Sequence, residues 1–457
     1  MMEELKGKRK EIKDITLKIL ELVKKRLKLA KEIGDIKRKL NLPVEDYNVE
    51  AELKREVIDY CNRENLDPQL GLKVLSLLIQ ESIKLEKEND TFTLSKVIQE
   101  AKRLEKEGKE VIHLEVGELD FEPVKEALEG IKEGLRKGLY RYSDAKGDLE
   151  LRSRLAKEFN QIYSLNLKED NILITPGGRF ALYLTFKSLL KMGEEVIGFE
   201  PIYPPYRQIC ELEGIRFIPI RTELEKGWSP DINLVQKNIS KLTRMMIINY
   251  PNNPTGKILS RKEMEELIGI AKDWDLFILN DEVYSSFSFK GPFNSLLTFN
   301  YDKSIVISSF SKSHSMSGFR VGYIIAKEET IDKMVKLQSL MITCMPPFLQ
   351  YSALKALEAK TKKFVEEVKR RAEEVSKRLK DLPVRFYEPD GALYIFPEVI
   401  KKEFNSDKFV KDMLYKHGVA LASGKNFGDY PKNFRLSLCQ PIERLLESID
   451  KMKKELE

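Results

Sequence analysis

The feature that most constrains the fold of this chain is a series of seven short apolar runs in its middle part. They lie at residues 171–175, 195–199, 216–220, 244–250, 276–280, 304–309 and 322–326. Each run has the length and composition of a buried strand, and segments with a helical pattern separate many of them, which predicts an open α/β sheet. Ligands in such sheets bind at the carboxyl ends of the strands, so functional side chains are expected just after the runs.

Lys312 stands just after the sixth run, in the segment Ser309-Phe310-Ser311-Lys312, and Arg320 follows it. A lysine at the end of a strand, flanked by hydroxyl groups and followed by an arginine, suits a covalent bond to pyridoxal phosphate. The segment alone is weak support, because most lysines are solvated surface charges. Its neighbours in the sequence strengthen the interpretation.

Three further motifs occur in order around Lys312. Asn-Asn-Pro-Thr-Gly at 252–256 and Asp-Glu-Val-Tyr at 281–284 precede it, and Phe-Arg-Leu-Ser at 434–437 follows it. This ordered set resembles the fold-type I pyridoxal-phosphate aminotransferases, from about residue 92 to the C-terminus. The resemblance implies an α/β domain over residues 91–457. Its large part, at about 136–359, would hold a seven-stranded, mostly parallel sheet, and a smaller α+β part, at about 92–135 and 360–457, would close over the substrate.

The resemblance also implies how the cofactor ring is held. Asp281 would pair with the pyridine nitrogen and keep it protonated, which makes the ring an electron sink. Tyr284 and Asn253 would contact the phenolic oxygen, and Tyr203 would stack on the ring. Lys312, once displaced from the cofactor, would move a proton between the α-carbon of the substrate and the cofactor.

The phosphate group is expected at the start of a helix. The Pro-Gly-Gly-Arg turn after the first run can direct the backbone amides of Gly178 and Arg179 at an anion. The residues that the resemblance adds as phosphate ligands are Ser309, Ser311 and Arg320, with Tyr142 reaching the phosphate of the neighbouring subunit.

Arg435 is expected to bind the substrate. The resemblance implies that its guanidinium clamps the α-carboxylate through two parallel hydrogen bonds, helped by Asn253 and by the backbone near Gly117. Leu119 stands where many members of the family have proline. This departure concerns the shape of the segment at residues 115–120, called here the entry loop.

The first 40 residues predict one long amphipathic helix. No proline interrupts residues 5–40, and about 36 residues of helix extend roughly 54 Å, which is longer than a small globule, so a partner chain is expected to cover it. Arg26 interrupts the apolar seam, where a charge is costly unless a buried carboxylate or an anionic ligand meets it. The apolar members of the seam, three or four positions apart, are Ile12, Ile15, Ile19, Leu22, Leu29, Ile33, Ile36 and Leu40.

Two more helices are expected before residue 90. Pro43 ends the first helix, a second is predicted from Asp46 to about Asn62, and Asp67-Pro68 opens a third. These helices, within about residues 5–90, resemble the AroQ-type, all-helical chorismate mutases, whose interlocked dimers use a long first helix. The resemblance implies a domain at residues 1–90 that rearranges chorismate to prephenate.

The residues carried over from this resemblance would bind a dianion. Chorismate rearranges without any nucleophile, so the enzyme must hold the reactive conformer and stabilise charge on the breaking ether oxygen. The groups implied for the carboxylates and the ether oxygen are Arg9 of a partner chain, Arg26, Lys37 and Glu86. Those implied for the hydroxyl group and the ring are Asp46, Glu50 and Ser82.

Two positions depart from the usual mutase pattern. Val49 stands where many members have an arginine before the second-helix glutamate, and Glu86 stands where many have glutamine. A glutamate donates a hydrogen bond only when it is protonated. We therefore expect mutase activity to favour acidic pH, unless burial raises the pKa of Glu86 far enough.

Composition narrows the class of protein. The formal charge is only +6 although 33% of the residues are charged, which favours no nucleic-acid or membrane partner. Fourteen Lys or Arg against five Asp or Glu between Lys6 and Lys39 make the first helix locally basic. The four cysteines are scattered and no apolar signal segment opens the chain, so a reducing cytoplasm is expected.

The leading functional hypothesis is a bifunctional homodimeric enzyme of aromatic amino-acid biosynthesis. It would make prephenate from chorismate and aminate phenylpyruvate or 4-hydroxyphenylpyruvate, with glutamate or aspartate as amino donor. Prephenate or aspartate aminotransferase activity, and a pyridoxal-phosphate lyase, remain alternatives, as does a helical region that only dimerises. A transcription regulator with an aminotransferase-like domain is disfavoured, because DNA-reading motifs need short helices joined by a tight turn.

Overall fold

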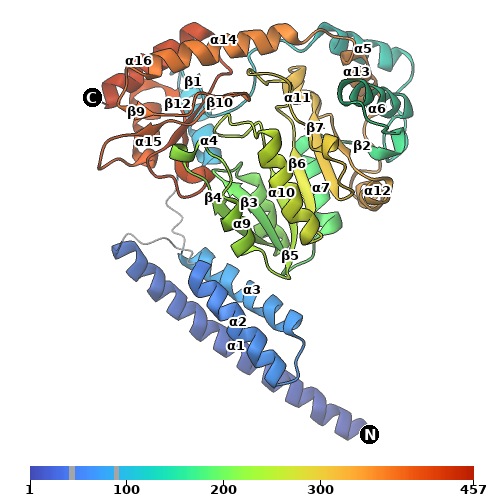
Figure 1. The fold of residues 1–457 in the computed structure, drawn as a ribbon, viewed down its shortest axis with the longest axis vertical. Coiled ribbons are helices and arrows are strands. Elements are labelled where there is room, and N and C mark those ends of the chain that lie inside the picture. Colours follow the sequence, from blue (N-terminus) through green and yellow to red (C-terminus); the bar gives the residue numbers. More distant parts are fainter. Residues whose placement is uncertain (41–46, 87–91, 457) are drawn as a thin grey trace. The chain divides into compact units, whose positions relative to one another are not determined.

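The structure is a computed structural model that describes residues 1–40, 47–86 and 92–456. The chain divides into two compact units (Figure 1). The first unit comprises the chain up to residue 91 with the short segments Lys191–Glu194 and Glu213–Arg216, and the second comprises the remainder.

The first unit contains three helices, α1 (Met2–Lys39), α2 (Tyr47–Arg63) and α3 (Pro68–Glu86). The three helices expected from the sequence are therefore confirmed, and α1 has 38 residues where about 36 were expected. α1 and α2 both pack on α3. Pro68 begins α3, where the missing N–H of proline costs nothing.

The apolar seam of α1 is exposed in the single chain. Leu22, Leu29 and Ile36 have exposed fractions of 64%, 59% and 56%, whereas Ala30, on the side toward α3, has 6%. A helix of 38 residues extends about 57 Å, so two shorter helices cannot cover all its sides.

All seven apolar runs form strands, and these strands make one sheet in the order β2-β8-β7-β6-β5-β3-β4. β3, β5, β6 and β7 pair in parallel, and β8 is antiparallel to both β2 and β7. The strands are β2 (Ile172–Thr175), β3 (Glu195–Glu200), β4 (Arg216–Arg221), β5 (Thr243–Ile248), β6 (Phe277–Asp281), β7 (Ser304–Ser309) and β8 (Gly322–Ile325). The expected seven-stranded, mostly parallel sheet is confirmed.

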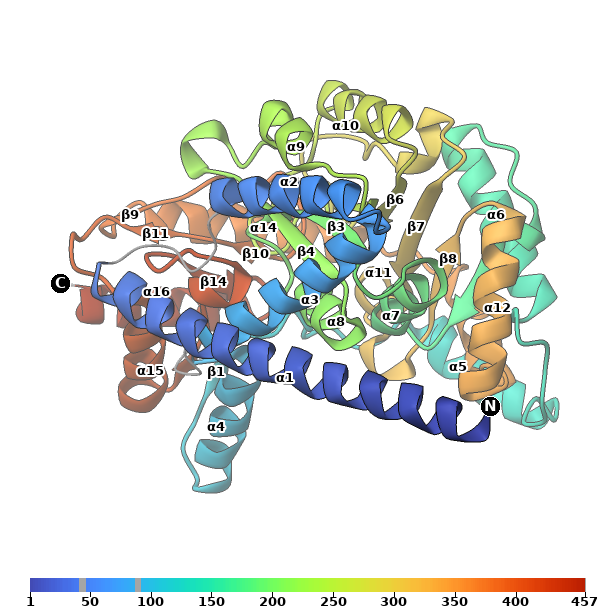
Figure 2. The ribbon, with the colours of Figure 1, turned by 90° about the horizontal axis from the view of Figure 1, so that it is seen from below.

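Helices cover both faces of this sheet, which explains why its central strands are apolar along their whole length. α9 (Ile232–Asn238) and α10 (Arg261–Asp273) lie on one face, and α7 (Gly178–Leu189) and α8 (Pro205–Glu213) lie on the other (Figures 1 and 2). Ser260 caps α10 in a capping box with Glu263.

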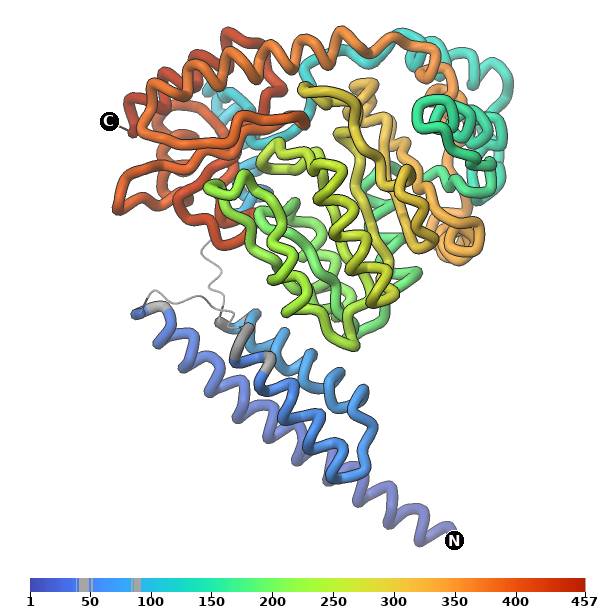
Figure 3. Tube along the Cα trace, viewed as in Figure 1, coloured from blue at the N-terminus to red at the C-terminus, as the bar shows by residue number. Residues whose placement is uncertain are grey.

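A smaller α+β part brings the beginning of this unit beside its end. β1 (Ile112–His113) pairs in parallel with β12 (Val419–Ala420), and the Cα trace shows these distant segments side by side (Figure 3). The other short strands are β9 (Val384–Arg385), β10 (Tyr394–Ile395), β11 (Glu398–Val399), β13 (Ala422–Ser423) and β14 (Phe434–Ser437). Its helices are α4 (Leu94–Lys106), α14 (Lys362–Leu379), α15 (Ser406–His417) and α16 (Ile442–Leu456).

The remaining helices lie between these elements in the sequence. They are α5 (Lys125–Arg136), α6 (Leu149–Tyr163), α11 (Phe310–Ser313), α12 (Glu328–Ile342) and α13 (Pro347–Ala356). α11 follows β7 immediately, so Lys312 stands at the carboxyl edge of the sheet, where the sequence placed it.

Candidate active sites

The carboxyl ends of the parallel strands gather the expected side chains of the second unit. Asp281 is the last residue of β6 and Ser309 the last residue of β7. Lys312 follows on α11, and Asn253 follows β5. Because β8 runs the opposite way, Arg320, which precedes it, comes to the same edge.

Lys312 points its amine at the entry loop. Its Nζ donates a hydrogen bond to the backbone carbonyl of Gly117. Burial lowers the pKa of Lys312, and the positive charges of Arg435 and Arg320 act in the same direction, although Cys439 and Glu118 oppose them. A lysine with a lowered pKa has a larger neutral fraction near neutral pH, which is the form that attacks a carbonyl or accepts a proton.

Asp281 is a buried carboxylate with a specific hydrogen-bond partner. Its Oδ2 accepts from the hydroxyl group of Tyr206 at 2.6 Å, and its Oδ1 accepts from the backbone N–H of Val283 at 3.3 Å. Burial raises its pKa to about 6, against the opposing effect of these hydrogen bonds. A protonated ring nitrogen placed beside it would therefore be favoured, because it keeps the carboxylate charged and paired.

Tyr206 is a contact that the sequence did not predict. It is fully buried near the start of α8 and packs edge-on against Tyr203 at 5.7 Å between ring centroids. The only signal in the sequence is the spacing Tyr-Pro-Pro-Tyr at 203–206. This spacing could have suggested that both tyrosines stand at the same strand end.

The turn before α7 forms a cradle for an anion. Gly177 has a φ of 80°, and a Cβ built there would lie 2.5 Å from Nη2 of Arg320, so only glycine allows the guanidinium to come this close. Gly178 then opens α7, whose first N–H groups have no partner within the helix. A phosphate group fits this combination of helix start and guanidinium.

The two hydroxyl groups expected at the phosphate lie next to each other, and a Cβ built at Gly178 would lie 3.8 Å from Cβ of Ser309. Ser309 donates from Oγ to Oγ of Ser311 at 2.8 Å, and the backbone N–H of Ser311 donates to Oγ of Ser309 at 3.1 Å. Together with the cradle, the residues present fit the phosphate of pyridoxal phosphate.

Arg179 contributes its side chain as well as its backbone. Its Nη2 donates to the hydroxyl group of Tyr203 at 2.6 Å, and Tyr203 raises the pKa of Arg179. The sequence had predicted only a role for the backbone amide of Arg179. The guanidinium is a cation that stands beside the tyrosine expected to cover the cofactor ring.

Arg435 is a deeply buried charge, with 2% of the residue exposed. Its Nη1 donates to Oδ1 of Asn253 at 2.9 Å, and its Nη2 donates to the backbone carbonyl of Glu115. Its Nε has no hydrogen-bond partner among the described residues. A buried donor without an acceptor suits an incoming carboxylate, because buried polar groups are otherwise paired.

Tyr394 joins the two sides of the site. Its hydroxyl lies 2.8 Å from that of Tyr284, and its ring lies 4.4 Å from the guanidinium carbon of Arg435. A Cβ at Gly117 would collide with this hydroxyl group, so the entry loop needs glycine there. No pattern in the sequence indicates Tyr394, because its strand has only two residues.

Within the described part of the chain, Tyr142 makes no hydrogen bond to the residues of the phosphate cradle. It is 87% exposed, the condition expected of a residue that would act in a neighbouring subunit. Its role stays a prediction.

In the first unit, the structure brings Arg26 and Ser82 together. Nη1 of Arg26 donates to Oγ of Ser82 at 2.5 Å and to the backbone carbonyl of Leu78 at 2.7 Å. Ser82 in turn donates to the carbonyl of Leu78 at 2.8 Å. A basic residue of α1 and a hydroxyl of α3 therefore face each other, as a shared substrate site requires.

The other residues predicted for the mutase site differ in their burial, and two of them are not fully described by the structure. Lys37 on α1 and Glu50 on α2 are partly buried, and Arg9 is exposed near the free end of α1. Asp46 and the side chain of Glu86, the last residue of α3, lie outside the described part of the chain. Their roles stay predictions.

No group of three or more His, Cys, Asp or Glu side chains in residues 1–40, 47–86 and 92–456 is arranged to hold a metal ion. Among the same residues, no helix is long and apolar enough to cross a membrane.

Two family models match the chain. Residues 109–450 match the aminotransferase class I and II model, and residues 8–87 match the chorismate mutase type II model. The two matches follow one another along the chain in the order expected from the motifs.

Among curated proteins, the chain is similar to an aspartate aminotransferase of Thermotoga maritima, with 37% identity over 347 residues, 76% of this chain and 91% of that protein. It is also similar to aromatic-amino-acid aminotransferase 2 of Thermococcus litoralis, with 34% identity over 356 residues, 76% of this chain and 92% of that protein. Both similarities cover nearly the whole relative.

Solved structures of aminotransferases also superpose on this chain. The crystal structure of aspartate aminotransferase from Thermotoga maritima superposes with a TM-score of 0.76 at 36% identity, covering 79% of this chain and 96% of that one. That of an aromatic aminotransferase from Pyrococcus horikoshii superposes with a TM-score of 0.73 at 31% identity, covering 80% and 98%.

Proposed function

The chain belongs to the class I and II aminotransferases and carries a type II chorismate mutase domain before the aminotransferase domain; from this premise we propose that it makes prephenate from chorismate and aminates an aromatic keto acid of the same route. Phenylpyruvate or 4-hydroxyphenylpyruvate is the proposed acceptor, and glutamate or aspartate the donor. The domain boundaries proposed are 1–90 and 91–457. The observation that carries the proposal is the joining of two enzyme domains in one chain.

For the mutase reaction, we propose that cations of α1 hold the two carboxylates of chorismate. Arg26 already faces Ser82 across α1 and α3, at 2.5 Å. Lys37 and Arg9 of a second copy of the chain would complete the positive surroundings of the dianion. Fixed charges of this kind favour the reactive conformer and stabilise negative charge on the ether oxygen without any proton transfer to carbon.

For the amino-transfer reaction, the class I and II family uses pyridoxal phosphate, and we propose that this chain binds it in the cradle before α7. When bound, this cofactor supplies an electron sink for charge at the α-carbon of the substrate. Asp281, held by Tyr206, would keep the ring nitrogen protonated. Arg435 would take up the α-carboxylate with its free Nε, and Nζ of Lys312 would remove the α-proton.

The donor is proposed to be a dicarboxylic amino acid. Arg435 meets one carboxylate, and Arg179, fixed by Tyr203 at 2.6 Å, is a second cation that could meet the other. An aromatic acceptor would instead place its ring near Tyr203 and Tyr284. Prephenate, which has two carboxylates and a ring, is the second candidate acceptor, and the same two cations favour it.

The assignment of each activity to one domain is testable with two substitutions. Lys312→Ala should lower transamination by about 10³-fold or more and leave chorismate consumption unchanged, because the proton-transfer amine is lost. Arg26→Ala should lower chorismate consumption by about 10²-fold or more and leave transamination unchanged, because a fixed positive charge is lost.

Lys28→Ala is the matched control for Arg26→Ala, because Lys28 is exposed on the same helix and has no proposed role. It should retain both activities. Loss of both activities in either Lys312→Ala or Arg26→Ala would contradict the assignment of separate sites.

A further inference from the structure

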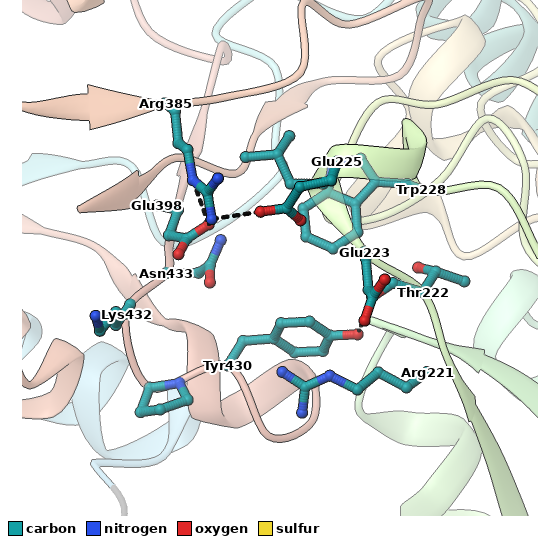
Figure 4. Close-up of a pocket in the computed structure, with 12 residues that line it drawn as sticks. Arg221, Thr222, Glu223, Glu225, Trp228, Arg385, Glu398, Tyr430, Lys432 and Asn433 are labelled. Atoms are coloured by element: carbon teal, nitrogen blue, oxygen red, sulfur yellow. Dashed lines mark hydrogen bonds and ion pairs between the residues drawn. The ribbon is translucent and has the colours of Figure 1, made fainter. Parts of the chain in front are cut away.

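A pocket of about 290 Å³ lies in the second unit, apart from the residues assigned to the cofactor and the substrate (Figure 4). One wall is the segment from the end of β4, residues 221–228. The other wall comes from the C-terminal part, at Arg385, Glu398 and residues 430–433. The pocket therefore joins chain segments that the family resemblance assigns to the large and the small part.

The charged side chains around the pocket balance. Three are basic, namely Arg221, Arg385 and Lys432, and three are acidic, namely Glu223, Glu225 and Glu398. A pocket with equal numbers of both charges suits a molecule that itself carries one charge of each sign.

The arginine at the rim is already neutralised. Arg385 reaches Glu225 at 2.6 Å and Glu398 at 2.9 Å, so it bridges the two walls (Figure 4). Lys432, in contrast, makes no side-chain hydrogen bond or ion pair within the described part of the chain. Arg221, the other arginine of the lining, lies 3.6 Å from Asp429 and over the ring of Tyr430, so the ammonium group of Lys432 is the basic group available to a ligand.

Two buried donors of the lining lack acceptors. Nε1 of Trp228 and Nδ2 of Asn433 have no hydrogen-bond partner among the described residues, although the two residues are only 2% and 4% exposed. Buried N–H groups are rarely left unpaired. Both groups can only donate, so the partner that they lack is an acceptor such as a carboxylate.

We propose that this pocket is a regulatory site for a zwitterionic aromatic α-amino acid. Its carboxylate would accept from Trp228, Asn433 and Lys432, and its ammonium group would take the place of the exposed Lys226, whose Nζ lies 3.2 Å from Glu223. Arg221 lies 4.8 Å from the ring of Tyr430 and would shift to let an aromatic side chain pack against the rings of Tyr430 and Trp228. The volume is close to the lower end of ligand pockets, which is about 300 Å³, and so suits a molecule of amino-acid size.

A chain of aromatic rings connects the pocket to the substrate-binding arginine. Trp228 and Tyr430 both contact Phe396, at 5.9 Å between ring centroids, and Phe396 contacts Phe427 at 5.7 Å. The ring of Phe427 lies 4.9 Å from the guanidinium carbon of Arg435. Closely packed rings of this kind cannot shift singly, so a ligand that moves Trp228 also moves the surroundings of Arg435.

This coupling gives the site a function. A ligand held by residues 221–228 on one side and 430–433 on the other would restrain the closure of the two parts and shift Arg435 away from its substrate-bound position. The choice of an aromatic amino acid rests on the proposed function as well as on the lining, because such an amino acid would be the end product. The expected effect is feedback inhibition.

Binding can be measured without interference from the active site. The holoenzyme is first reduced with borohydride, which fixes the cofactor on Lys312 and prevents exchange with free amino acids. The chain has two tryptophans, and Trp274→Phe leaves Trp228 as the only one. L-phenylalanine should then change the Trp228 fluorescence saturably, with one site per chain.

Analogues and variants test the chemistry of the site. Phenylpropionate, which lacks the ammonium group, and phenethylamine, which lacks the carboxylate, should each bind at least about tenfold more weakly. Lys432→Ala and Asn433→Leu should weaken L-phenylalanine to the same extent, and the exposed Lys401→Ala should not. If Asn433→Leu does not fold, Lys432→Ala, at a partly exposed position, carries the comparison.

The coupling has a separate measurement in the unreduced enzyme. L-phenylalanine should inhibit the turnover of glutamate with a component that excess glutamate does not overcome, and Lys432→Ala should lose this component. Purely competitive inhibition would contradict the coupling. The absence of saturable binding to the reduced enzyme would overturn the site and leave a water-filled cavity as the explanation.

These outcomes are distinct from failure of the proposed function. An enzyme that binds L-phenylalanine at Trp228 but does not aminate aromatic keto acids would retain the site and lose the function. An enzyme that makes phenylalanine but does not bind it after reduction would do the reverse.

Discussion

At the scale of single residues, Glu86 is the position where the proposed mutase site differs most from what the reaction needs, because it replaces the glutamine found in many related mutases. It stands where a neutral donor is wanted at the ether oxygen of chorismate, and a glutamate donates only when protonated. We therefore propose that its side chain carries a proton during the reaction, and we expect the rate of chorismate consumption to fall from acidic to alkaline pH.

The variant Glu86→Gln tests this expectation. Glutamine donates at every pH, so the variant should retain its activity at alkaline pH. The wild type should lose at least about tenfold in activity there, which corresponds to about 1.4 kcal/mol of lost transition-state stabilisation. The measurement is the kcat/KM for chorismate from pH 5 to pH 9. A wild-type profile that is flat over this range would contradict the role of Glu86.

His113 lies beside Glu115, the residue that contacts Arg435, our proposed substrate clamp. Its Nδ1 lies 2.9 Å from Oε1 of Glu115 and its Nε2 lies 3.0 Å from Oε1 of Glu105. The hydrogen bond to Glu115 raises the pKa of His113 to about 9, against the opposing effect of burial. The backbone carbonyl of Glu115 accepts from Arg435, so the protonated imidazole fixes the residue that orients the clamp.

A raised pKa in the folded state stabilises the fold below the unfolded pKa and ceases to do so as pH rises through the folded value. The wild type should therefore be more stable than His113→Gln by up to about 3 kcal/mol at pH 6, and by much less at pH 10. Urea unfolding at pH 6, 8 and 10 measures the difference. A difference that does not change with pH would show that His113 is not charged in the folded protein.

The functional residues that belong to motifs could be predicted from the sequence, whereas most of the contacts between side chains could not. Lys312, Asp281 and Arg435 belong to recognisable sequence motifs. The structure places Lys312 and Asp281 at one edge of the large sheet, and Arg435, on β14 of a smaller sheet, donates to Asn253. Tyr206 and Tyr394 could not be found in this way, because each acts on another side chain across a packed interior. Only the fold brings them to Asp281 and Tyr284.

At the scale of elements, α1 has an apolar face that nothing covers within the described part of a single chain. Its apolar seam is exposed over most of its length, with 59% at Leu29 and 48% at Ile33. The three-or-four spacing in the sequence predicted the helix correctly, but periodicity cannot say what covers a helix face. We propose that a second copy of the chain does, as the resemblance to interlocked mutase dimers implies.

A double substitution within the seam should separate the two activities. Leu29→Asp with Ile33→Asp would bury two charges in each copy, at a cost of several kcal/mol each, so chorismate consumption should be lost and transamination retained. Leu17→Asp is the matched control. Leu17 is 55% exposed on the same helix but lies about 120° from Leu29, and its substitution should retain both activities.

Complementation between variants tests whether the site is shared. Arg9→Ala and Arg26→Ala should each lose mutase activity, and a mixture of the two unfolded and refolded together should recover about one quarter of it. This fraction follows because half of the dimers are mixed and each mixed dimer has one intact site. No recovery would mean that Arg9 does not come from the partner.

At the scale of the whole molecule, the sequence predicted the class of the fold because its two signals are strong. Seven apolar runs became seven strands of one sheet, and a proline-free amphipathic stretch became one 38-residue helix. The pocket at Trp228 could not be predicted. Its walls are residues about 160 to 210 positions apart, and no local pattern reports that they meet.

The central claim is that one chain catalyses two reactions of a single route. The most direct measurement is to incubate the purified protein with chorismate, glutamate and pyridoxal phosphate, and to follow chorismate and the amino products by mass over time, adding phenylpyruvate or 4-hydroxyphenylpyruvate in parallel. We expect prephenate from chorismate, and phenylalanine or tyrosine when the corresponding keto acid is present. Arogenate as the first amino product would identify prephenate itself as the acceptor. Prephenate without any aromatic amino acid or arogenate, under conditions where the protein transaminates aspartate, would contradict the claim.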